Sequence, residues 1–111
     1  MLPRAKSYEA LRAAFRWTIP ERFNIGVAVS RPWAKADPDR PVIYWRRKPG
    51  EIDNLTAGAL ERRSNQLAHA LGALGLARGD RVALVLPQSH QTAIAHVAIY
   101  KACLLYTSRR G

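Results

Sequence analysis

The fold is decided by residues 57–102, which read AGALERRSNQLAHALGALGLARGDRVALVLPQSHQTAIAHVAIYKA. The first part predicts a helix of about 18 residues, because leucines recur at helical spacing on one side and polar residues occupy the other. The leucines are Leu60, Leu67, Leu71 and Leu74, and the polar side carries Glu61, Arg62, Arg63 and Gln66. Thr56 is placed to cap the start of this helix, and Gly75 can end it in the left-handed conformation.

A strand is predicted next, over Val82–Leu86, where every residue is apolar. A strand with one wet face alternates apolar and polar residues, so this run predicts a strand covered on both faces, as in a parallel sheet. Pro87 ends the strand, Ser89 is placed to cap the next helix, and His90–Ala102 supplies that helix. A buried strand followed by a helix is half of a β-α-β crossover, and its second strand would have to follow Ala102.

Two helices are expected near the start of the chain. Ser7 is placed to cap a short helix from Tyr8 to about Arg16, with an apolar side that we expect to be buried. That side carries Leu11, Ala14 and Phe15. Periodicity after Phe23 does not separate a helix from an extended segment; a second helix is favoured over about 25–35, although Pro32 inside it removes a backbone donor and argues against a regular helix.

Residues 42–55 predict a β-hairpin. Val42–Trp45 has the β-branched and aromatic content of a strand, and Ile52–Leu55 returns as a weaker second strand. Between them, Pro49 and Gly50 stand where a type II turn needs a fixed and a positive φ. An isolated hairpin is only marginally stable in water, so this one is expected to pack on the helices.

The composition is that of a globular protein with a strong positive charge. The 111 residues include 18 Lys and Arg against 8 Asp and Glu, a formal net charge of +10, and 48% are hydrophobic. No apolar run approaches the roughly 20 residues that a membrane span needs. The charge raises nucleic acid or an anionic membrane surface as a partner. However, the basic residues are scattered and not interleaved with the tryptophans in any repeat, so a solvated arginine-rich surface is favoured over a nucleic-acid face.

Few residues could carry chemistry, and no glycine-rich phosphate loop is present. His90 and His96 lie on different faces of a helix with no carboxylate nearby in sequence, so a structural role is favoured for them and for His69. Ser89 lacks the G-x-S-x-G context of a nucleophile, which favours helix capping. Cys103 is the single cysteine and can form neither an internal disulfide nor, without histidine partners, a zinc site. The sequence therefore assigns no catalytic, cofactor-binding or metal-binding residue.

Two segments remain as weaker candidates for a binding surface. Gln88, Ser89 and His90 follow the predicted strand, and ligands of parallel sheets collect beyond the carboxyl ends of strands. The densest basic triplet, Arg46 to Lys48, lies at the predicted hairpin tip. We interpret that triplet as a solvated turn in preference to a binding patch.

Several short motifs occur in a fixed order between Tyr8 and Ala102. They are FRWTIPERFNI at 15–25, WA at 33–34, DPDRP at 37–41, LT at 55–56, SNQLA at 64–68, GL at 75–76, GDRVA at 79–83, LPQS at 86–89 and AIAHVAIYKA at 93–102. Together they resemble the amino-terminal end of the adenylate-forming acyl-CoA synthetases, the AMP-dependent synthetase/ligase superfamily. The branch they look most like contains the acetyl-CoA synthetase-like and medium-chain acyl-CoA ligases. The resemblance implies an α/β fold, the incomplete N-terminal part of the large domain: N-terminal helices, a β-hairpin, then helix, strand and helix.

The resemblance also implies an activity for the full-length family, that of an acid-thiol ligase. ATP and a carboxylic acid form an acyl-adenylate and pyrophosphate, the thiol of coenzyme A then displaces AMP, and Mg²⁺ shields the phosphates. We expect a cytoplasmic enzyme of fatty acid metabolism. The family's catalytic motifs have no counterpart here, so this segment is expected to be scaffold, without a bound cofactor and inactive alone. The acyl chain length and the oligomeric state are not implied. The alternatives are a small basic module that binds nucleic acid or protein, and a stand-alone interaction protein on the same scaffold.

Three departures from the family pattern stand out. Pro32 falls in an expected helix, and Ala59 replaces the acidic residue that often completes the capping box after Thr56. The third is CLLYTSRRG at 103–111, which resembles a translated sequencing adapter. We therefore assign residues 1–102 to a partial N-terminal scaffold and 103–111 to a non-matching tail, and hypothesise that the reading frame is truncated near Ala102. Resequencing of the locus tests this, and a genuine stop codon after Gly111 would refute it.

The predicted strand over residues 82–86 also bears on stability. If some of its neighbours are missing, apolar area stays in water. Leaving four such side chains half exposed forfeits on the order of 3–6 kcal/mol, which is comparable to the whole stability of a small domain. We therefore expect the chain to be poorly soluble or molten when it is expressed alone.

Overall fold

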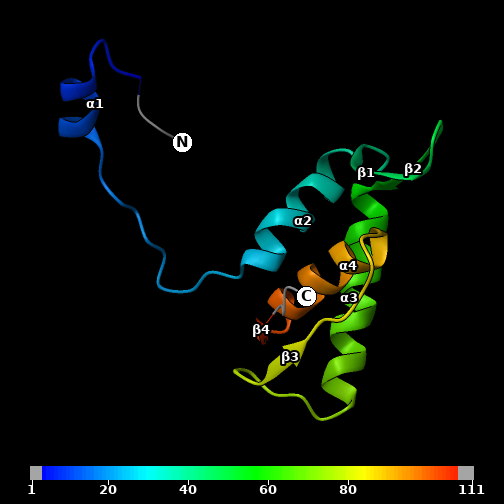
Figure 1. Ribbon diagram of the computed structural model, residues 1–111. Coiled ribbons are helices and arrows are strands. Elements are labelled where there is room, and N and C mark those ends of the chain that lie inside the picture. Colours follow the sequence, from blue (N-terminus) through cyan, green and yellow to red (C-terminus); the bar gives the residue numbers. More distant parts are fainter. Residues whose placement is uncertain (1–3, 108–111) are drawn as a thin grey trace.

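The computed structural model describes residues 4–107 (Figure 1). In chain order the elements are α1 (Tyr8–Ala14), α2 (Ile25–Ala36), β1 (Pro41–Lys48), β2 (Glu51–Thr56), α3 (Ala57–Ala73), β3 (Arg81–Ala83), α4 (His90–Lys101) and β4 (Leu105–Thr107). Helices α2, α3 and α4 pack together as the body of the molecule, with the β1–β2 hairpin at one end. Helix α1 stands apart from this body on an extended segment (Figure 1).

Local signals in the sequence place the helices of the body correctly. Helix α3 is capped by Thr56, whose Oγ1 accepts a hydrogen bond from the Ala59 N–H at 3.3 Å. The chain leaves this helix through Gly75, which has a φ of 90°, as the sequence predicts. Helix α2 runs through Pro32 and starts at Asn24, whose Oδ1 accepts from the Val27 N–H at 3.0 Å.

The apolar stripe of α3 is only partly covered. Leu60 is buried, Leu67 and Leu71 are half-buried, and Leu74 is 77% exposed. Coverage therefore falls along the helix, because α2, α4 and the hairpin all pack toward its first half.

The core lies where the hairpin meets α3 and α4. Leu55, Leu60 and Ile94 form its centre, and the half-buried residues packed around them are Val42, Ile43, Ala59 and Val97. Ala98 and Ile99 of α4 are also buried, at 0% and 1% exposure. This arrangement confirms the expectation that the hairpin packs on the helices.

The hairpin itself has the predicted strands and turn. Its strands are antiparallel, with Ile43 opposite Leu55 and Trp45 opposite Asp53. Gly50 in the turn has a φ of 81°, a conformation that side-chain-bearing residues rarely adopt. The start of α3 is tied to the loop before β1 by two backbone bonds, of which the Ala57 N–H to Arg40 carbonyl bond is 2.9 Å.

The strand predicted over residues 82–86 is shorter and more exposed than expected. Strand β3 is Arg81–Ala83 and pairs in parallel with β4, so α4 connects two parallel strands and completes the β-α-β unit. The expectation that the whole run is covered on both faces is wrong, because Val85 is 90% exposed and Leu86 47% exposed. The reason is that the described part of β4 pairs only as far as Ala83, and no other described strand lies beside β3.

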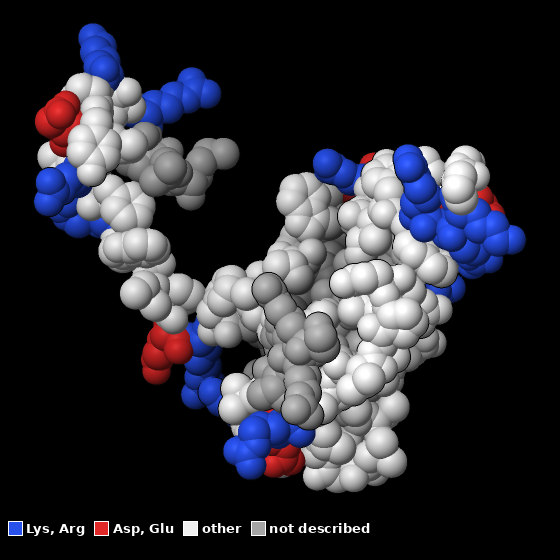
Figure 2. Space-filling model, in the orientation of Figure 1, with Lys and Arg blue, Asp and Glu red and all other residues white. Residues whose placement is uncertain are grey.

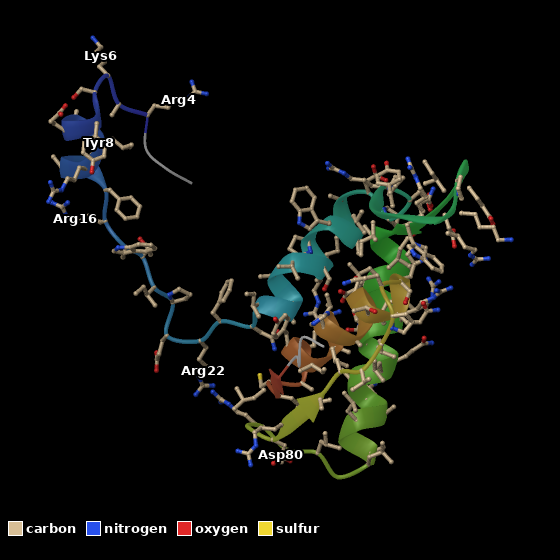
Figure 3. All side chains as sticks on the ribbon, in the orientation of Figure 1. Arg4, Lys6, Tyr8, Arg16, Arg22 and Asp80 are labelled. Carbon is tan, nitrogen blue, oxygen red and sulfur yellow. The ribbon has the colours of Figure 1, made fainter. Side chains whose placement is uncertain are left out.

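The first helix also differs from its prediction. Helix α1 ends at Ala14 and has no buried residue; Leu11 and Phe15 are half-buried and Ala14 is exposed. Residues 4–23, here called the arm, lead from α1 to the body, and the labelled side chains of Arg4, Lys6, Tyr8 and Arg16 lie around α1, away from the body (Figure 3). With no neighbouring element to pack on, the apolar side of α1 stays in water.

The structure also bears on membrane association. Among residues 4–107, no helix has both the length and the apolar character needed to cross a membrane.

A close approach of α2 to α4 at Gly26 generates the first prediction. A Cβ at this position would lie 2.6 Å from the Lys101 backbone nitrogen and 2.8 Å from the Val97 carbonyl oxygen. We expect Gly26→Ala to lower the free energy of unfolding by about 1–3 kcal/mol, because the clash with backbone outweighs the gain in helix propensity. Urea denaturation followed by far-UV circular dichroism measures this.

The matched control is Gly72→Ala in α3, where an added Cβ meets no atom within 4 Å. This variant is expected to gain about 0.5–1 kcal/mol from helix propensity alone. Equal effects of the two substitutions would contradict the close helix contact at Gly26.

Candidate functional site

Polar side chains from all three helices of the body meet in one place, here called the three-helix cluster. Its members are Arg31 of α2, Glu61, Ser64 and Asn65 of α3, and Lys101 of α4. Lys101 is at the centre, with its side chain 5% exposed. Its ammonium donates to Glu61 Oε2 at 2.6 Å, to Asn65 Oδ1 at 2.8 Å and to Ser64 Oγ at 2.9 Å.

Glu61 is the anionic member of this cluster. Burial by itself would raise the pKa of its carboxyl, but hydrogen bonds led by that from Lys101, together with the Lys101 charge, lower the pKa from 4.5 to about 2. The side chain is only 16% exposed. Glu61 belongs to the polar side of α3, opposite the leucines, yet it is largely buried, because α2 and α4 both pack against α3 and cover more than one stripe.

The cluster is built to hold the helices together. An ammonium group has three donors, and Lys101 uses them on Glu61, Ser64 and Asn65. A lysine whose donors are all engaged is not free to act as a base or nucleophile. We therefore assign the Lys101 amine a structural role.

A second group, here called the hairpin cluster, lies where the hairpin meets the start of α4. Its members are Trp45, Arg47, Asp53 and His90. The His90 ring meets Trp45 edge to face at 5.5 Å, and its Nδ1 lies 3.8 Å from Asp53 Oδ2. Arg47 lies over Trp45 at 5.1 Å and is 3.7 Å from the same Asp53 oxygen. Figure 2 shows basic side chains gathered at this end of the body.

This cluster is not predicted from the sequence, because Asp53 and His90 are far apart in the chain. The one local signal for part of the cluster is the hairpin register, which sets Trp45 opposite Asp53. His90 is buried, with its side chain 8% exposed, rather than at the surface. Its Nε2 atom is enclosed and has no hydrogen-bond partner among the described residues. At 3.8 Å the pair with Asp53 is longer than a hydrogen bond, and the enclosed nitrogen cannot reach a substrate.

The remaining candidates from the sequence are members of neither cluster. Ser89 is the residue before α4, as predicted, but its side chain makes no capping bond, so that part of the prediction is wrong. The Thr92 hydroxyl ties this turn instead, donating to the Pro87 carbonyl at 2.6 Å. His69 is exposed, and His96 Nδ1 lies 2.9 Å from the Thr92 carbonyl oxygen.

The other surface candidates are exposed as expected. Gln88 and the basic triplet at 46–48 face solvent, and Cys103 is an exposed free thiol that accepts a hydrogen bond from Asn24 Nδ2 at 3.6 Å. Within residues 4–107, His, Cys, Asp and Glu side chains nowhere form a group of three that could hold a metal ion.

Comparison with known proteins gives a consistent set of relatives. The family described as AMP-binding enzyme matches residues 30–108, which is more than half of the chain. Human mitochondrial acyl-coenzyme A synthetase ACSM3 is 33% identical over 98 residues, covering 83% of this chain and 17% of that protein. Acetyl-coenzyme A synthetase of Methanothrix soehngenii is 33% identical over 90 residues, covering 78% of this chain and 13% of that protein. The chain thus spans about a sixth or less of the length of these curated relatives.

Solved structures agree with the sequence matches. Acetoacetyl-CoA synthetase from Streptomyces lividans superposes with a TM-score of 0.70 at 30% identity, covering 76% of this chain and 13% of that one. A fatty acyl-adenylate ligase from L. pneumophila gives 0.71 at 23% identity, covering 76% and 15%, and shows the fold alone. The predicted fold class, an α/β N-terminal part of the large domain of an adenylate-forming enzyme, is confirmed by these matches.

The Glu61 carboxylate generates a prediction of pH dependence. Because its pKa is about 2 in the folded chain and 4.5 ordinarily, its contribution to stability is complete above about pH 5 and is lost as the pH falls toward 2. We expect Glu61→Gln to lower the free energy of unfolding by about 2 kcal/mol at pH 7 and to flatten its decline between pH 5 and 2. Glu51→Gln, at the exposed hairpin turn, is the control and should keep the wild-type pH profile.

His90 generates a prediction of the opposite sign. His90→Phe keeps a ring against Trp45 and removes the enclosed Nε2, so the free energy of unfolding should stay level or rise by about 1 kcal/mol. The exposed His69→Phe is the matched control and should change stability by less than about 0.5 kcal/mol. Chemical denaturation at pH 7.5 measures both. A clear loss for His90→Phe would mean that the imidazole makes a stabilising interaction through Nε2 or Asp53.

Proposed function

Because the chain belongs to the AMP-binding enzyme family, we propose that it forms the start of the large domain of an acid-thiol ligase, an AMP-forming acyl-CoA synthetase. The observation that carries this proposal is that both the order of the sequence motifs along the chain and the fold match this family. The family model matches residues 30–108, and 76% of this chain superposes at a TM-score of 0.70 on a synthetase that is 30% identical.

The reaction proposed for the whole enzyme has two steps. The carboxylate oxygen of the acid attacks the α-phosphorus of ATP and releases pyrophosphate, which leaves an acyl-adenylate. The sulfur of coenzyme A then attacks the acyl carbon and releases AMP, which leaves an acyl-CoA thioester. Developing charge on phosphate in such steps is stabilised by backbone amides, basic side chains and Mg²⁺.

We assign this segment a structural part in that reaction. Lys101, the most connected polar residue, is fully engaged within the body, and the enclosed His90 cannot meet a substrate. We propose that ATP, coenzyme A, Mg²⁺ and the acid bind other parts of the enzyme, and that the enzyme acts in fatty acid metabolism in the cytoplasm.

The decisive experiment starts from the source DNA. The coding sequence on the 3′ side of codon 102 should encode further ligase motifs, and the encoded longer protein should be expressed and purified. We expect acid-dependent exchange of pyrophosphate into ATP, and AMP release that requires coenzyme A and stops when Mg²⁺ is chelated. A panel of acids of increasing chain length then identifies the substrate.

The 111-residue chain in the same assay is the control and should show neither reaction. A longer protein without acid-dependent exchange would overturn the proposal. If the short chain instead bound a nucleic acid with sequence preference at physiological salt, the basic binding module would replace it, since salt-dependent binding alone is expected of any protein with this charge.

A further inference from the structure

A cavity of about 250 Å³ opens beside the three-helix cluster, where α2, α3 and α4 meet. Its polar lining residues are Arg31 of α2, Asn65 and His69 of α3, and Lys101 of α4. Val27 and Ala68 supply apolar wall. A cavity lined from three helices depends on the body being folded, unlike a loose surface patch.

The charges around this cavity do not balance. The Glu61 carboxylate is ionised at neutral pH, since its pKa is about 2, and Lys101 neutralises it at 2.6 Å. Both carboxylate oxygens are used, because Oε1 also accepts from Asn65 Nδ2 at 3.1 Å. The guanidinium of Arg31 therefore remains as a net positive charge at the cavity.

The donors of Arg31 and His69 are open to a ligand. Arg31 Nε is 3.6 Å from Glu61 Oε1, which is beyond hydrogen-bond distance, and the side chain is 52% exposed. The His69 residue is exposed, and within residues 4–107 its side chain makes no hydrogen bond or ion pair. The cavity is thus lined by an arginine held only by a 3.6 Å ion pair and by a histidine on a second helix, whereas both oxygens of the nearby Glu61 carboxylate already accept hydrogen bonds.

We propose that this cavity binds the phosphoryl group of a small phosphomonoester, or inorganic phosphate itself. The planar fork of an arginine can donate two parallel hydrogen bonds to phosphate oxygens. The remaining oxygens of the tetrahedral phosphoryl group can accept a hydrogen bond from His69 on the neighbouring helix. A carboxylate ligand has only two oxygens in one plane, so it bridges the two helices less well. The formal net charge of +10 draws anions toward the molecule before they bind. This site lies outside the proposed catalytic function, which assigns no ligand to these helices.

The test is hydrogen exchange measured by mass spectrometry on the longer protein that the source DNA encodes, since it reports each of these helices separately. Inorganic phosphate and glycerol 3-phosphate are titrated in parallel, with sodium chloride holding the ionic strength constant. We expect saturable protection of peptides covering residues 27–31, 65–69 and 101–102, because a ligand that bridges helices stabilises their folded arrangement. If both anions saturate, the phosphoryl group alone is recognised. If only one saturates, the ligand is either free phosphate or a phosphomonoester, according to which anion binds.

Matched variants make the result specific. Arg31→Gln should raise the half-saturating concentration about tenfold, and Arg62→Gln, an exposed arginine outside the cavity, should change it less than about twofold. If Arg31→Gln fails to fold, the exposed His69→Gln carries the test, with an expected rise of about threefold to fivefold. Protection that does not saturate, equal losses in Arg31→Gln and Arg62→Gln, or helices that show no protection at all would overturn the site.

Discussion

The ion pair between Lys101 and Glu61 is the interaction on which the body of this molecule depends. It joins the end of α4 to the first turns of α3 at 2.6 Å, with both side chains largely withdrawn from water. Helix α2 reaches the same point, because Asn24 Nδ2 donates to the Lys101 carbonyl at 2.9 Å and Gly26 lies against the Lys101 backbone. Withdrawing two charges from water is costly, and the added bonds from Ser64 and Asn65 offset that cost. One lysine therefore fixes how three helices cross.

The apolar core follows from that crossing. With the end of α4 held against α3, Ala98 and Ile99 come to lie in full burial, and Ile94 one turn earlier meets Leu60 and Leu55. Leu55 belongs to the hairpin, so the position of α4 also decides where the hairpin rests and why His90 is enclosed beneath it. A small core with few large side chains leaves little redundancy. The polar cluster and the apolar core therefore stabilise each other instead of acting as separate layers.

Sequence patterns predict what is local in this fold and fail where the outcome depends on the number of neighbours. The caps at Thr56 and Asn24, the positive φ of Gly50 and Gly75, and the hairpin strands depend on a few adjacent residues, and all but the Asn24 cap are predicted from the sequence. The burial of Glu61 is not predicted, because a single apolar stripe indicates one packed helix face, whereas two helices, α2 and α4, pack on α3. The contact of His90 with Asp53 depends on how the hairpin docks, which no local pattern encodes. The family resemblance succeeds for a different reason, since it draws on the order of motifs along the whole chain.

The exposed apolar residues form the strongest physical link between this fold and the proposed function. Parallel strands are found almost only where both faces of the sheet are covered, yet Val85 and Leu86 follow β3 in water and Leu105 of β4 is 57% exposed. The arm carries Trp17 and Ile19 at about 80% exposure, although selection for an independent small domain would remove such side chains from its surface. Both features fit a sequence adapted to a larger sheet, and the synthetase relatives, of which this chain spans 17% or less, have the length to supply one. The buried contacts of this segment are therefore concentrated in the three-helix body, while the strands and the arm carry the exposed apolar surface that the proposed larger enzyme would cover.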